Sequence, residues 1–170
     1  MRFVGRKREL RALENAFQSH DSSFIPIYGR RRVGKSELIK NFIRDKKALY
    51  FLGKQAPARL QLREFLRNGA LAFQQPLLEQ ASVDSWQRAI SLVIEQVPAG
   101  EKIVLVMDEF QWTVEACPEL PSVLQSFIDN GWEDGCKVCL IVCGSNGGLW
   151  KKECWEKKVL YLVAERVRYF

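Results

Sequence analysis

A chain of 170 residues fits one domain of about 100–200 residues, which excludes a large multidomain assembly. Hydrophobic residues make up 47% of the chain and charged residues 27%, a composition that can bury a core and differs from that of disordered proteins. The formal net charge of +6 suits an anionic partner such as nucleic acid or a phosphate-bearing ligand, and ordinary surface charge explains it equally well.

The chain is charged from Arg2 onward, and no apolar run is long enough for the core of a signal peptide or for a membrane span. We therefore predict a soluble, cytoplasmic protein without a membrane partner. Five cysteines, an odd number, argue against a disulfide framework in such a protein. Alternation along a strand sends Cys136 and Cys139 to opposite faces, so we interpret both, with Cys143, as buried structural thiols rather than metal ligands.

Short apolar runs alternate with segments of helical period, which is typical of an α/β protein with a mainly parallel sheet. The first predicted elements are a helix over 10–17, a strand over 24–28, a helix over 38–43 and a strand over 48–52. One or two helices within 57–80, a helix over 86–97, a strand over 103–107, a helix over 122–130 and a strand over 138–143 follow. Pro26 is unfavourable at the centre of a sheet, and we expect Gly69 and Pro76 to break the segment 57–80.

A phosphate-loop pattern, GxxxxGK followed by Ser or Thr, is matched at every specified position by Gly29, Arg30, Arg31, Arg32, Val33, Gly34, Lys35 and Ser36. A strand precedes this loop and a helix follows it, so backbone N–H groups and the helix N-terminus can point together at a polyphosphate. Gly29 and Gly34 let the backbone turn tightly and approach the anion. We expect Lys35 to reach the β- and γ-phosphates of ATP and the Ser36 hydroxyl to coordinate Mg²⁺.

A second motif is the Asp108–Glu109 pair, which ends the apolar run 103–107. Ligands of open α/β sheets bind at the carboxyl ends of the strands, where this pair is expected to lie. We predict that Asp108 belongs to the Mg²⁺ site and that Glu109 is the general base that activates water. The alternative is a pair of solvated acids that caps the next segment.

Two further features leave alternatives open. Ser145 and Asn146 follow the strand over 138–143, where they either contact the γ-phosphate or the attacking water, or form a turn with the neighbouring glycines. Arg30, Arg31 and Arg32 occupy variable positions of the loop pattern, so each either contacts phosphate or points to solvent or a partner subunit.

Four segments together resemble a known family: YGRRRVGKS, MDEFQW, the N-terminal FVGRKREL and LIVCGSN. They are similar to the archaeal-type ATPases, STAND-like members of the AAA+-related P-loop group, over residues 1–155. The resemblance implies a three-layer ATPase core in which the strand over 138–143 lies between those over 24–28 and 103–107. It also implies that Val4, Gly5 and Arg6 line the adenine end of the site and that Ser145 is the sensor.

The tail, residues 156–170, departs from that family. Similar chains continue with a segment like SPLFGRRT, a further strand and a helical or winged-helix region, so the last strand and the C-terminal region are expected to be missing. The codons for Lys158 to Arg166 can be read in a shifted frame, in which the third base of each codon is joined to the first two bases of the next. This frame permits Ser, Pro, Leu, Phe, Gly, Arg, Arg, Thr in order. The tail is either frameshifted or the naturally short end of a diverged member, and the coding DNA distinguishes the two.

Together these features predict a P-loop ATPase that binds ATP and hydrolyses it with Mg²⁺, with an arginine from another copy of the chain as a route to homo-oligomers. The alternative is a nucleotide-dependent regulatory module with little turnover, which binds DNA or a protein. The excess of basic over acidic residues favours this alternative. The chain contains no NKxD-like guanine-reading segment, which argues against a GTPase. The loop alone also suits a small-molecule kinase, but the carboxylate pair favours activation of water.

Overall fold

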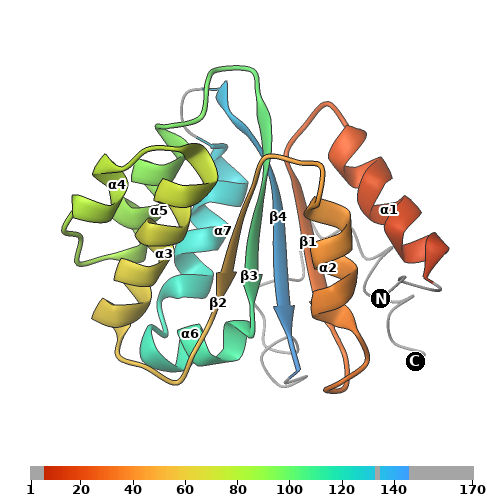
Figure 1. The fold of residues 1–170 in the computed structure, drawn as a ribbon, viewed down its shortest axis with the longest axis horizontal. Coiled ribbons are helices and arrows are strands. Elements are labelled where there is room, and N and C mark those ends of the chain that lie inside the picture. The colour runs from red at the N-terminus through yellow and green to blue at the C-terminus, as the bar shows by residue number, and fades with distance from the viewer. Residues whose placement is uncertain (1–5, 133–134, 146–170) are drawn as a thin grey trace.

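The computed structural model describes residues 6–132 and 135–145, which form a parallel sheet between two groups of helices (Figure 1). The strands are β1 (Ser23–Tyr28), β2 (Ala48–Leu52), β3 (Lys102–Asp108) and β4 (Lys137–Gly144). The helices are α1 (Lys7–Gln18), α2 (Lys35–Ile43), α3 (Ala58–Phe73), α4 (Leu77–Gln80), α5 (Trp86–Ile94), α6 (Phe110–Ala116) and α7 (Leu120–Asn130). This three-layer α/β architecture confirms the predicted fold class.

The strand order of the described sheet is β1-β4-β3-β2, and every pairing is parallel. The strand β4 therefore lies between β1 and β3, as the family resemblance implied. Register pairs such as Ile25 with Ile141 and Leu105 with Leu140 place apolar residues side by side across the sheet. Such continuous apolar strands are expected where both faces of a parallel sheet are covered by helices.

Alternating residues of each strand divide the interior into two apolar clusters. From β4, Cys139 and Ile141 pack with α1 and α2, whereas Leu140 and Val142 pack with the helices on the opposite face. Cys136, just before β4, joins the second cluster, so it and Cys139 lie on opposite sides of the sheet as predicted. The four described cysteines are free and buried.

Gly69 and Pro26 occupy positions that differ from the sequence prediction or refine it. Gly69 does not break a helix but lies inside α3. A Cβ at this position would stand 3.0 Å from Val93 Cγ2 and 3.3 Å from Leu49 Cδ1, so the neighbours leave little room for a larger residue. The absence of a side chain thus permits close packing of α3 against α5 and the sheet. Pro26 lies in β1, whose pairing among the described strands is with β4 alone, and a proline is tolerated on such an edge.

The helix predicted over 86–97 ends at Ile94, although Val97 is still buried. The helix α6, directly after the Asp–Glu pair, was not predicted. Within residues 6–132 and 135–145, no helix is long and apolar enough to cross a membrane. The boundary expected at residue 155 and the tail 156–170 lie outside the described residues.

Candidate nucleotide-binding site

The carboxyl ends of β1, β3 and β4 meet at one edge of the sheet, because the three strands are parallel neighbours. The phosphate loop follows β1, the Asp108–Glu109 pair ends β3, and Ser145 follows β4. A cavity of about 500 Å³ opens here, lined by Arg31, Arg32, Gly34, Lys35, Ser36, Glu37, Glu109 and Trp112. The structure therefore brings the two predicted motifs to the same opening.

The loop adopts a conformation that suits close approach of an anion. Gly34 precedes α2 with φ 79°, in the left-handed region that glycine adopts without strain, and Arg32 has φ 62°. The buried Lys35 donates from Nζ to the carbonyl oxygens of Gly29 at 2.9 Å and Arg30 at 2.8 Å. The ammonium group thus lies at the mouth of the loop in front of the N-terminus of α2, where a phosphate is favoured.

Asp108 is only 1% exposed, and each of its carboxylate oxygens accepts a hydrogen bond. The Glu109 N–H donates to Oδ1 at 2.8 Å, and the Tyr50 hydroxyl donates to Oδ2. Burial, reinforced by the Asp108 carboxylate, raises the pKa of Tyr50 far above its usual value, so the phenol remains a donor. Burial, and secondly Asp108, also raises the pKa of the Cys143 thiol beneath the site.

The oxygen donors of this site fit Mg²⁺. The Asp108 carboxylate accepts a hydrogen bond from the Tyr50 hydroxyl, and the Ser36 hydroxyl lies near the same phenol, so the two oxygen groups are close together. Within the described part of the chain, no cluster of three or more His, Cys, Asp or Glu side chains could hold a metal alone. Mg²⁺ in nucleotide sites commonly takes one or two protein oxygens and completes its shell with phosphates and water, which is what Asp108 and Ser36 can accommodate.

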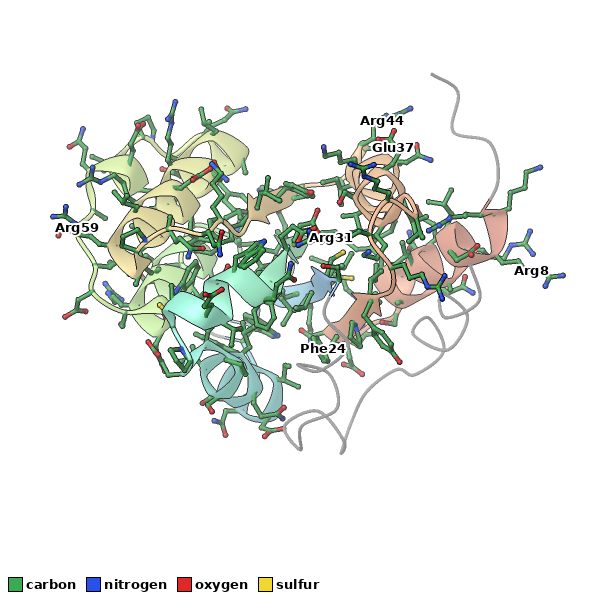
Figure 2. All side chains as sticks on the ribbon, turned by 90° about the horizontal axis from the view of Figure 1, so that it is seen from below. Arg8, Phe24, Arg31, Glu37, Arg44 and Arg59 are labelled. Carbon is green, nitrogen blue, oxygen red and sulfur yellow. The ribbon has the colours of Figure 1, made fainter. Side chains whose placement is uncertain are left out.

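Glu109 begins α6 with φ 49° and lines the cavity. The Gln111 amide donates to Glu109 Oε2 and lies 3.5 Å from the Ser145 hydroxyl. From the opposite side, Arg31 Nε lies 3.5 Å from the same hydroxyl, and Figure 2 shows Arg31 near the end of β4 in a view from this edge. Ser145 therefore lies between the phosphate loop and the Asp–Glu segment.

Of the remaining predicted residues, one contacts the phosphate loop, one lies away from the cavity and the others are not described. Arg6, just before α1, has φ 56° and donates to the carbonyl oxygen of Val33, so it contacts the loop from outside. Arg30 is exposed and does not line the cavity. Val4, Gly5 and Asn146 lie outside the described residues.

Sequence reasoning missed three contributors: Tyr50, Gln111 and Trp112. Tyr50 lies on the same face of its strand as Ala48, a period-two relationship that the sequence contains. What the sequence lacks is the register that sets β2 beside β3. Gln111 and Trp112 belong to α6, and without that helix no spacing relates them to Glu109.

The fold and the site define a P-loop nucleotide-binding domain of the three-layer α/β class. Residues 3–167 match the family described as an ATPase domain predominantly from Archaea, and the chain belongs to this family. Family membership supports ATP binding and ATPase activity in general terms.

Two solved archaeal structures are similar in fold. The Walker-type ATPase PABY2304 of Pyrococcus abyssi aligns with 87% of this chain and 47% of its own, with a TM-score of 0.61 and 20% identity. Cdc6p from Pyrobaculum aerophilum aligns with 87% of this chain and 41% of its own, with a TM-score of 0.59 and 17% identity. These identities support the shared fold alone.

Two proteins of Methanocaldococcus jannaschii are similar in sequence. The uncharacterized protein MJECL04 is 28% identical over 144 residues, which are 85% of this chain and 30% of that protein. The uncharacterized ATP-binding protein MJ0423 is 51% identical over 45 residues, which are 26% of this chain and 76% of that protein. The chain thus spans less than half the length of MJECL04 and of both structural neighbours.

Proposed function

We propose that this chain binds ATP at the phosphate loop and hydrolyses it with Mg²⁺. The observation that carries the proposal is the convergence of Lys35, Ser36 and the Asp108–Glu109 pair on one sheet edge, three of them lining the same cavity. The family supports nucleotide chemistry, and the geometry supplies the candidate roles.

In the proposed reaction, the loop N–H groups and the N-terminus of α2 hold the phosphates, and Lys35 moves from its carbonyl partners to the β- and γ-phosphate oxygens. Asp108 and Ser36 hold Mg²⁺, which when bound neutralises charge on the phosphate oxygens. Water attacks the γ-phosphorus, the bond to the β–γ bridging oxygen breaks, and Glu109 accepts the proton from water. Gln111, through its hydrogen bond to Oε2, orients the Glu109 carboxylate toward the cavity.

Two substitutions separate binding from turnover. Lys35→Ala removes the ammonium group assigned to the β- and γ-phosphates, so we expect nucleotide binding to be lost. Glu109→Gln keeps the shape of the side chain but removes the base, so ATP should bind normally while steady-state phosphate release falls by about 10²–10⁴-fold. Nucleotide titration and phosphate release measure the two effects.

Matched controls lie at the opposite edge of the sheet. Lys47 and Glu101 precede β2 and β3 and form an ion pair at 2.8 Å there. Lys47→Ala and Glu101→Gln should leave both nucleotide affinity and turnover unchanged. Normal phosphate release from Glu109→Gln would refute the role of Glu109 as base.

The second candidate, a nucleotide-dependent module for DNA or a protein partner, is favoured by the exposure of Arg30, Arg31 and Arg32 beside the site. An arginine of this group that reaches the nucleotide site of another copy would require the chain to form homo-oligomers. DNA affinity measured with ATP, with ADP and without nucleotide tests the DNA-binding module, and a steep decrease of that affinity with salt is expected if the arginines contact phosphates. Negligible turnover together with nucleotide-dependent DNA binding would favour this candidate over the ATPase.

A further inference from the structure

Tyr50 lies on β2, which pairs with β3 so that Tyr50 stands opposite Val106 and Leu52 opposite Asp108. Side chains two residues apart in a strand share a face, so Tyr50 and Asp108 point to the same side of the sheet in adjacent strands. This side is the one covered by α2, whose second residue is Ser36. Tyr50 therefore lies between the helix of the phosphate loop and the Asp–Glu strand.

The Tyr50 side chain lies beside both groups assigned to the metal. Its hydroxyl donates to Asp108 Oδ2, and the Ser36 hydroxyl lies near the phenol. The Tyr50 ring is held in turn by Lys40, whose Nζ lies 5.6 Å from the ring centroid. This cation–π contact favours one orientation of the ring.

The Asp108 carboxylate needs such support. It is almost fully buried, and within residues 6–132 and 135–145 it takes part in no salt bridge. The groups that hydrogen-bond to it are neutral: the Glu109 N–H on Oδ1, the Tyr50 hydroxyl on Oδ2 and the Cys143 thiol. Neutral donors restrict rotation of the carboxylate without cancelling its charge, which leaves that charge available to a cation.

We propose that Tyr50 is a positioning residue of the Mg²⁺ site, whose hydroxyl orients the Asp108 carboxylate toward the metal of the bound nucleotide. This inference rests on the proposed function. Groups that hydrogen-bond to a metal-ligating residue commonly contribute about 10–100-fold to metal affinity. A purely structural tyrosine would instead affect folding, or nucleotide binding with and without the metal alike.

The test is Tyr50→Phe, which keeps the ring and removes only the oxygen. Binding of the fluorescent nucleotide mant-ADP is measured in EDTA and in Mg²⁺, and Mn²⁺ titration of the ADP complex is followed by electron paramagnetic resonance. We expect the affinity in EDTA to be unchanged and Mn²⁺ affinity to fall by about tenfold. The matched control is Ser23→Ala, which removes a buried hydroxyl at the far end of β1 and should leave Mn²⁺ affinity unchanged.

Each other outcome overturns the inference in a distinguishable way. Mn²⁺ affinity equal to that of the wild type would show that Tyr50 does not position the metal site, and would not contradict the proposed function. An equal loss of mant-ADP affinity in EDTA and in Mg²⁺ would make Tyr50 a support of the loop instead. Failure of the wild-type chain to bind mant-ADP in either condition would refute the proposed function, and the role of Tyr50 with it.

Discussion

Gly53 directly follows β2, and its backbone lies against the segment that carries the Asp–Glu pair. Its N–H donates to the Asp108 carbonyl oxygen at 2.8 Å. A Cβ at this position would stand 2.5 Å from Thr113 Oγ1 and 2.7 Å from the Glu109 carbonyl oxygen. Glycine is therefore required here by close approach of two backbones, one of which leads into the site.

We expect Gly53→Ala to destabilise the fold by about 1–3 kcal/mol, because the loop after β2 must move away from α6. Urea unfolding measures the change. Adding Thr113→Ala removes the side-chain contact but leaves the contact with the Glu109 backbone, so the double variant should remain less stable than Thr113→Ala alone. Equal stability of the double variant and Thr113→Ala would show that the side-chain contact alone opposes a larger residue.

Among the larger elements, α3 is joined to the site by polar side chains, of which Gln61 is the buried one. Gln61 is buried at 2% exposure and donates from Nε2 to the carbonyl oxygens of Ala56 at 2.9 Å and Trp112 at 3.4 Å. Its Oε1 accepts from Thr113 Oγ1 at 3.1 Å. Gln61 thus ties the loop after β2 and the helix α6 to the layer of helices behind them.

Gln61→Leu should lower the free energy of unfolding by about 1–3 kcal/mol, because buried groups on α6 and in the loop lose their partners. Gln55→Leu is the matched control, since Gln55 is exposed in the same loop and should change stability by less than about 0.5 kcal/mol. Urea unfolding of both variants provides the comparison. Equal small effects would mean that water replaces the lost hydrogen bonds.

For the molecule as a whole, burial of thiols links stability to alkaline pH. Burial raises the pKa of Cys136 from its ordinary value of 9.0 to about 11, and raises the pKa values of Cys117, Cys139 and Cys143 as well. Between these values the folded chain retains protons that the unfolded chain has lost. Stability is therefore fully present below pH 9.0 and declines as the pH rises toward about 11.

The expected result is a free energy of unfolding that falls across this range of pH, measured by urea unfolding at several values. Cys136→Ala should be less stable at neutral pH, because it loses buried contacts, yet should show a shallower decline with pH. A decline as steep as that of the wild type would show that Cys136 does not contribute to it.

Much of the fold could be predicted because its signals are contiguous in the chain. The apolar runs of all four strands, the loop from Gly29 to Ser36 and the Asp108–Glu109 pair can each be recognised without knowledge of their neighbours in space. Where prediction failed, local preference was outweighed by contacts: Gly69 remains helical because α5 and the sheet pack closely against it. The strand order followed from the family resemblance rather than from the residues.

The motifs that bind phosphate, and the alternation that divides the apolar side chains between two faces, are properties of the chain as written. The close approaches of Tyr50 to Asp108, of Gly53 to Glu109 and of Arg31 to Ser145 are decided by the tertiary structure. The members of these pairs are separated by 58, 56 and 114 positions. They meet only after parallel pairing has set the register between strands, because register is a collective outcome of packing both faces of the sheet and no short segment encodes it.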